Sequence, residues 1–141
     1  MKNISAGSGD RSGSPIETIA AAAEGLIYIS ETDADIEPVT GDLCDSVTAS
    51  DVLKISNAAE GTPIEERRAD EFFARLTQIR DWYGDREKER AEGFAKLYDV
   101  LKQQLRELRV FRIGSVQIAI YVVGIDNSGR LAGVMTRAVE T

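Results

Sequence analysis

Four acidic side chains alternate along the chain, at Glu31, Asp33, Asp35 and Glu37, and this spacing could hold a metal ion. Carboxylate oxygens bind hard cations such as Ca²⁺ and Mg²⁺, and alternate residues of a strand point to the same face. The segment lacks the glycine and the final bidentate glutamate of a calcium-binding loop. Acidic runs on acidic proteins are usually solvated, so we favour a solvated face over a resident metal site.

The histidine and cysteine content excludes several classes of enzyme. The sequence contains no histidine and one cysteine, Cys44. Histidine-based catalytic triads, imidazole metal sites, an intrachain disulfide and a cysteine-rich zinc site therefore cannot form. Cys44 has no base beside it, so we expect a half-buried filler rather than a nucleophile. We accordingly expect a protein that is not an enzyme and that carries no metal or cofactor of its own.

The only tryptophan lies in the segment Asp81-Trp82-Tyr83-Gly84-Asp85, between two predicted helices. One interpretation is that Trp82 covers the core beneath this loop, and for an arbitrary tryptophan we favour it. The other is an exposed interface anchor, because tryptophan and tyrosine dominate the residues that carry binding energy in protein interfaces. The sequence leaves both interpretations open.

The last residues, Val139-Glu140-Thr141, continue a predicted strand almost to the end of the sequence. Most chain ends fray, so a strand that runs this far is unusual. The simpler interpretation is a strand that happens to end there. The functional one is an oxygen-rich tip that approaches a metal ion or a basic pocket in a partner.

Local signals predict the elements of the N-terminal half. The Ser- and Gly-rich residues 1–14 predict a disordered tail, followed by a single domain over residues 15–141. Ser14, Pro15 and Glu17 have the pattern of a capping box that starts a helix, and Leu26-Ile27-Tyr28-Ile29 has the length of a buried strand.

The section from residue 31 to residue 71 contains twelve acidic and three basic residues and gives weaker signals. We expect a strand around residues 36–40 and a short helix capped by Ser50. A further helix capped by Asp70 would place Phe72, Phe73, Leu76 and Ile79 on one side.

The strongest periodic signal is an amphipathic helix about six turns long, with apolar residues at steps of three and four from Phe94 to Leu108. Three strands follow, over residues 109–113, 116–125 and 131–140, with turn residues between them, and these predict an antiparallel meander. The middle strand is apolar on both faces, so helices should cover both. We therefore expect helix, sheet and helix layers.

Composition bounds the function further. The chain has 141 residues, 43% of them hydrophobic, and 24 acidic against 17 basic residues give a net charge of −7. This charge argues against direct binding of nucleic acid and favours a neutral or basic partner. The longest apolar run is far shorter than the roughly 20 residues of a membrane helix, so we expect a soluble protein. A single cysteine demands no oxidising compartment, so we expect the protein in the cytoplasm. We also expect a monomer.

Several of these segments together resemble the nuclease A inhibitor family. The resemblance covers residues 16–31 and 69–141, and it is carried by Gly25-Leu26, Ser30-Glu31, Asp81-Trp82-Tyr83, the helix Phe94–Leu105, Val110–Gly114, Tyr121–Gly124, Gly129 with Leu131–Gly133, and Val139–Thr141. It implies an α/β (α+β) fold, a three-layer α/β/α sandwich with a largely antiparallel central sheet that is similar to pathogenesis-related proteins.

The resemblance also implies a function. It implies a protein, not an enzyme, that blocks the active site of a magnesium-dependent, sugar-nonspecific ββα-metal nuclease. Glu31, Asp81, Trp82 and Thr141 correspond to the family residues that reach the nuclease. The oxygens of Glu31 and Thr141 would meet the catalytic magnesium of the nuclease directly or through water.

Two alternatives stay open because residues 33–70 do not align with the family. The chain could be an acidic interaction domain on the same scaffold that does not inhibit a nuclease. A carboxylate-metal enzyme is the third and weakest hypothesis.

Overall fold

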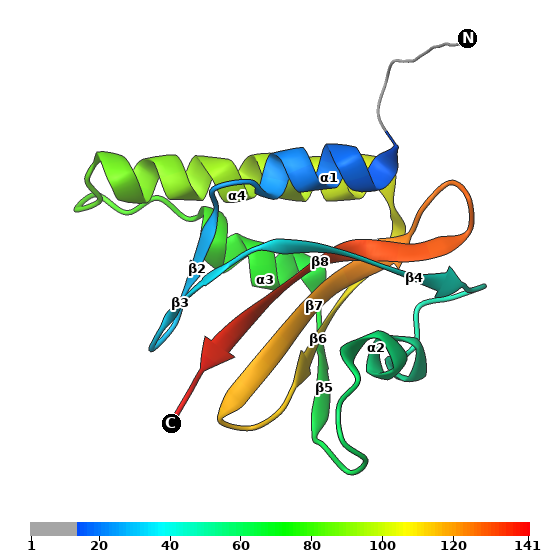
Figure 1. Ribbon diagram of the computed structural model, residues 1–141. Coiled ribbons are helices and arrows are strands. Elements are labelled where there is room, and N and C mark those ends of the chain that lie inside the picture. The colour runs from blue at the N-terminus through cyan, green and yellow to red at the C-terminus, as the bar shows by residue number, and fades with distance from the viewer. Residues whose placement is uncertain (1–13) are drawn as a thin grey trace, which may run out of the picture.

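A computed structural model of the protein describes residues 14–141 (Figure 1). The predicted disorder of residues 1–14 falls outside this range except at Ser14. The elements in chain order are α1 (Pro15–Ala23), β2 (Ile27–Ile29), β3 (Asp33–Asp35), β4 (Glu37–Leu43), α2 (Ala49–Ser56), β5 (Ile64–Arg67), α3 (Ala69–Thr77), α4 (Asp85–Gln104), β6 (Arg106–Ile113), β7 (Gln117–Ile125) and β8 (Arg130–Val139). Among the described helices, none is both long and apolar enough to cross a membrane.

A five-stranded antiparallel sheet with the order β4-β8-β7-β6-β5 forms the centre of the fold. The predicted meander is confirmed as β6-β7-β8. Strand β7 pairs with β8 along its whole length, from Gln117 opposite Val139 to Ile125 opposite Leu131. This register brings the C-terminal end of β8 next to the β6–β7 turn, at one end of the strands.

Helices cover both faces of the sheet, which confirms the mixed α/β fold with helix, sheet and helix layers (Figure 1). On one face, α1, α3 and α4 pack on inward-facing residues of the sheet such as Ile120 and Val122. On the other face, α2 contributes Val52 to a second cluster that includes Tyr121 and Val123. The two clusters take alternate residues of β7, as the period of a strand requires.

Helix α4 confirms the strongest periodic signal but ends earlier than the periodicity predicts. Its 20 residues correspond to about 30 Å, and its buried residues include Phe94, Leu97 and Leu101. The apolar spacing continues to Leu108, but the backbone becomes extended at Leu105, and β6 starts at Arg106. The prediction that Leu108 belongs to the helix and that β6 starts at residue 109 is therefore wrong.

The capping predictions are confirmed for one helix and wrong for two. Ser14 and Glu17 form the predicted capping box of α1. In α2 the N-cap is Thr48 rather than Ser50, because the Thr48 hydroxyl and the Asp51 carboxylate satisfy each other's backbone amides. Asp70 is not the N-cap of α3, because α3 already begins at residue 69.

The helix α3 also ends before the predicted apolar face is complete. It stops at Thr77, so Ile79 lies beyond it and is half exposed. The aromatic part of the predicted face is correct, since Phe73 is buried and Phe72 packs beside it.

The predicted strand at residues 26–29 is confirmed as β2, but the prediction that it is buried is wrong. Strand β2 pairs with β3 in a separate two-stranded ribbon, and Ile29 is half exposed. The ribbon lies against β8, where the Thr136 hydroxyl donates a hydrogen bond to the backbone oxygen of Asp35 at 2.8 Å. An apolar run of this length fits a central strand and a ribbon equally well, so the run alone does not decide between them.

The acidic section contains one strand that is longer than predicted, β4, and two strands that the sequence did not predict, β3 and β5. Strand β4 extends to Leu43, beyond the predicted residue 40. Strand β5 was not predicted, because three of its four residues are charged and it shows no apolar alternation. It forms as the edge strand next to β6, where charged residues are common.

Candidate partner-binding site

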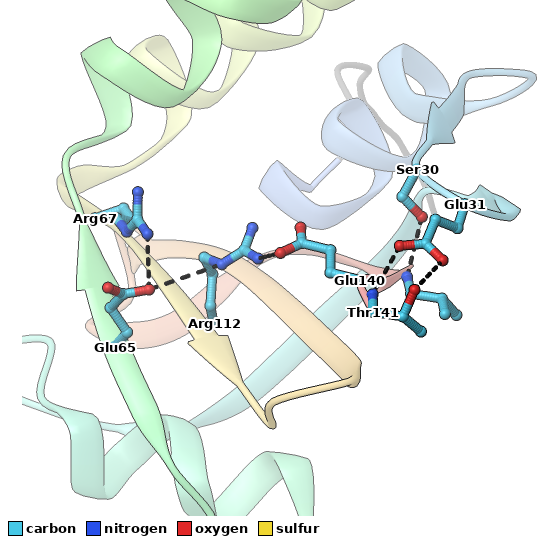
Figure 2. Close-up of polar contacts among 8 residues, drawn as sticks. Ser30, Glu31, Glu65, Arg67, Arg112, Glu140 and Thr141 are labelled. Carbon is cyan, nitrogen blue, oxygen red and sulfur yellow. Dashed lines mark hydrogen bonds and ion pairs between the residues drawn. The ribbon is translucent and has the colours of Figure 1, made fainter.

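The β2–β3 turn and the end of β8 meet at Glu31 and Thr141, which are 110 positions apart in the sequence (Figure 2). The backbone amide of Thr141 donates a hydrogen bond to Glu31 Oε2 at 2.7 Å. The Thr141 hydroxyl donates a second one to Glu31 Oε1 at 2.8 Å. One carboxylate thus holds residue 141 at two points, and both residues are exposed.

The turn that carries Glu31 is itself fixed by local hydrogen bonds. The Ser30 hydroxyl donates to the backbone oxygen of Thr32 at 3.1 Å and accepts from the Val139 amide at 3.0 Å. The Glu31 amide donates to the backbone oxygen of Val139 at 3.3 Å. These contacts attach the β2–β3 turn to β8 independently of the hydrogen bonds between the Glu31 side chain and Thr141.

The Glu31 carboxylate remains charged and keeps acceptor capacity. The backbone N–H and then the hydroxyl of Thr141 hold the pKa of Glu31 below its usual value. An ionised carboxylate has about four lone-pair sites, and the contacts with Thr141 use one on each oxygen. The Thr141 hydroxyl donates its proton to Glu31, so its own oxygen can also accept or ligate. The arrangement presents several oxygen ligands on an exposed surface.

A row of charged side chains continues from this pair across the sheet edge (Figure 2). Arg112 Nη2 lies 2.6 Å from Glu140 Oε1, and Arg112 Nε lies 3.9 Å from Glu65 Oε1. Arg67 also bonds to Glu65, at 2.9 Å. The Arg112 side chain is only 15% exposed, whereas those of Glu140 and Glu65 are about half exposed.

Asp81 and Trp82 lie on the connection between α3 and α4. Trp82 is 73% exposed, and its ring meets that of Tyr83 edge to face with centroids 4.8 Å apart. The interpretation that Trp82 covers the core is therefore wrong. Trp82 therefore presents a large aromatic surface to the solvent.

The structure brings together two of the four predicted site residues directly. Glu31 contacts Thr141, and within residues 14–141 no hydrogen bond or ion pair joins Asp81 or Trp82 to them. Figure 1 shows them apart, with the α3–α4 connection at the upper left of the view and the end of β8 at the lower left.

The alternating acidic run does not converge. Asp33 and Asp35 lie in β3, Glu37 starts β4 and faces Arg137 at 4.0 Å, and Glu31 bonds to Thr141. Over the described part of the chain, no three His, Cys, Asp or Glu side chains are grouped to hold a metal. The expected shared face is wrong, because the run crosses from a turn through one strand into another.

Cys44 is half-buried, as predicted. Burial raises the pKa of its thiol, and the negative charges of Asp51 and Glu107 raise it further. A raised pKa keeps the sulfur as a thiol at neutral pH, which disfavours nucleophilic chemistry.

Sequence reasoning missed Ser30 and Arg112 as parts of this region. Ser30 is part of the segment Ser30-Glu31 that carries the resemblance, but nothing in its sequence context indicates a role in the site. Arg112 did, because it lies two residues after Val110 and on the same side of β6, and Val110 is fully buried. A charged residue on the same side of a strand as a buried apolar residue indicates a specific partner, here Glu140.

Comparison with known proteins agrees with the resemblance. The family model of nuclease A inhibitor-like proteins matches residues 14–141, which is the whole described range and includes residues 33–70. No curated protein matches the chain significantly. The chain therefore belongs to the family of nuclease A inhibitor-like proteins, a family of nuclease inhibitors.

Proposed function

We propose that this protein inhibits a magnesium-dependent, sugar-nonspecific ββα-metal nuclease by occupying its active site. The exposed Glu31–Thr141 pair carries the proposal, since it offers oxygen ligands in a member of an inhibitor family. In this proposal the inhibitor domain comprises residues 15–141 and acts as a monomer on one nuclease.

The chemistry of such a nuclease favours this kind of surface. A nuclease that binds Mg²⁺ and phosphate has an active site that attracts negative charge and oxygen ligands. The inhibitor has a net charge of −7, and its Glu31 carboxylate is held ionised by Thr141. Glu31 and the Thr141 hydroxyl would approach the magnesium directly or through water, and charge complementarity would speed association.

Trp82 would supply the apolar anchor of the interface. Its side chain is 73% exposed in the free protein, so binding can bury a large aromatic area. Asp81 beside it would pair with a basic residue at the rim of the cleft. Truncating a central tryptophan commonly costs on the order of 2 kcal/mol or more, which is about 30-fold in affinity.

A plasmid-digestion assay tests the proposal. A purified nuclease of this type is titrated with the wild-type protein, with Trp82→Ala, with Asp81→Asn and with Thr141→Ala. Leu43→Ala is the matched control for Trp82→Ala, because Leu43 is 66% exposed at the end of β4. We expect stoichiometric inhibition by wild type and control, and weaker inhibition by the three site variants.

Two outcomes would contradict the proposal. If wild type leaves several such nucleases fully active, the hypothesis of an acidic interaction domain without inhibitory function replaces it. If wild type inhibits but Trp82→Ala and Thr141→Ala inhibit equally well, the inhibitory surface lies elsewhere on the protein.

A further inference from the structure

Val139, the last residue of β8, and the two residues after it are held by three separate parts of the chain. The Val139 amide donates to the Ser30 hydroxyl at 3.0 Å, and the Glu140 amide donates to the backbone oxygen of Val116 at 2.9 Å. Residue 141 is held by Glu31 at its amide and at its hydroxyl. Contacts therefore come from the β2–β3 turn and the β6–β7 turn, and a third comes from β6 through Arg112.

Arg112 provides the charged contact in this set. Its guanidinium is 2.6 Å from Glu140 and 3.9 Å from Glu65, so Glu140 is its principal partner (Figure 2). The Arg112 side chain is 15% exposed, so the ion pair is less screened by water than the other ion pairs nearby. The pair joins the end of β6 to the residue immediately before Thr141.

The position of Glu140 gives this pair a consequence for Thr141. A residue beyond the last strand has no strand ladder to fix it, and its backbone is free to rotate unless side chains hold it. Fixing Glu140 from both its backbone and its side chain restricts the direction in which residue 141 leaves the sheet. A preordered binding group loses less conformational entropy when it binds.

We propose that Arg112 and Glu140 are positioning residues for the inhibitory pair Glu31–Thr141. They do not contact the nuclease but hold Thr141 in the geometry that presents its hydroxyl and the Glu31 carboxylate together. This inference rests on the proposed function for its effect on inhibition, and on the free protein for its effect on order.

The test uses Glu140→Gln, which keeps the size of the side chain and removes its charge. Glu66→Gln is the matched control, because Glu66 is as exposed as Glu140 (47% and 48%), pairs with Arg109 of β6 at 2.7 Å and makes no hydrogen bond or ion pair with residues 139–141. Two quantities are measured for each variant: the heteronuclear NOE of the Thr141 backbone amide in the free protein, and the inhibition constant against the nuclease. The melting temperature of each variant is recorded alongside.

We expect Glu140→Gln to lower the Thr141 NOE and to weaken inhibition about tenfold, which corresponds to about 1.4 kcal/mol. Glu66→Gln should change neither the Thr141 NOE nor the inhibition constant. Both variants should melt at similar temperatures. An unchanged Thr141 NOE in Glu140→Gln would overturn the inference, as would an equal loss of inhibition in Glu66→Gln. If wild type inhibits no nuclease, the proposed function fails, while the NOE still decides whether the pair orders Thr141.

Discussion

The turn between β7 and β8 depends on one carboxylate oxygen, and its removal gives a prediction of defined size. Asp126 Oδ1 accepts three hydrogen bonds, from the Ser128 amide at 2.9 Å, the Ser128 hydroxyl at 2.7 Å and the Arg130 amide at 3.0 Å. A hydrogen bond to a charged group makes a net contribution of about 1.5–3 kcal/mol to stability. Water can reach the exposed Ser128 after truncation, so the three losses will not add in full.

We therefore expect Asp126→Ala to lower the free energy of unfolding by about 2–4 kcal/mol. Asp126→Asn keeps an oxygen in the same place and loses only the charge, so it should cost about 1 kcal/mol. Urea denaturation followed by circular dichroism at pH 7 measures both. Equal costs for the two variants, or a cost below about 0.5 kcal/mol for Asp126→Ala, would refute the reasoning.

The same carboxylate gives a pH dependence. Burial raises the pKa of Asp126, but the hydrogen bonds from the Ser128 hydroxyl and from the amides of Arg130 and Ser128 outweigh it, so the pKa lies below its usual value. A lowered folded-state pKa stabilises the protein above the unfolded pKa of about 3.9. This stability is lost as the pH falls through the folded-state pKa. The stability difference between wild type and Asp126→Asn should therefore shrink on acidification, and a difference that does not change with pH would contradict this assignment.

Two pairs of variants test the local structure by the same denaturation measurement. Thr48→Ala removes the capping box of α2 and should cost about 1 kcal/mol, whereas Ser50→Ala should cost almost nothing; equal costs would mean that Thr48 is not the cap. Glu107 has a φ of 58° and accepts a hydrogen bond from the Val47 amide. Glu107→Ala loses the bond and keeps the strained backbone, so it should be about 1 kcal/mol less stable than Glu107→Gly, and the opposite order would refute the strain.

The parts of the fold that were predicted correctly are those whose pattern is long and local. Helix α4 repeats its apolar spacing over several turns, and β7 is apolar on both faces with turn residues at each end. A long pattern of this kind fits few other secondary structures. The N-cap of α2 was predicted wrongly, although the sequence contains its signal: Asp51 follows Thr48 by three residues, as in a capping box. Ser50 was chosen instead because it lies closer in sequence to the apolar residues of the helix.

The parts that were missed depend on pairing between distant segments. Strand β5 has no apolar alternation and is a strand because β6 lies beside it. The contact between Glu31 and Thr141 spans 110 positions, and no periodicity or spacing can reveal it. The resemblance named both residues as members of the site, but the structure was needed to find that they bind each other.

The most direct test of the proposed mechanism is the effect of Mg²⁺ on the affinity of the inhibitor for the nuclease. The dissociation constant is measured by calorimetry with and without Mg²⁺, for wild type and for Glu31→Gln, which keeps the shape of Glu31 and removes its charge. If the oxygens of Glu31 and Thr141 approach the metal, Mg²⁺ will tighten the binding of wild type and will tighten that of Glu31→Gln much less. If Mg²⁺ changes both affinities by the same factor, the Glu31–Thr141 pair does not act at the metal, and the proposed mechanism is wrong.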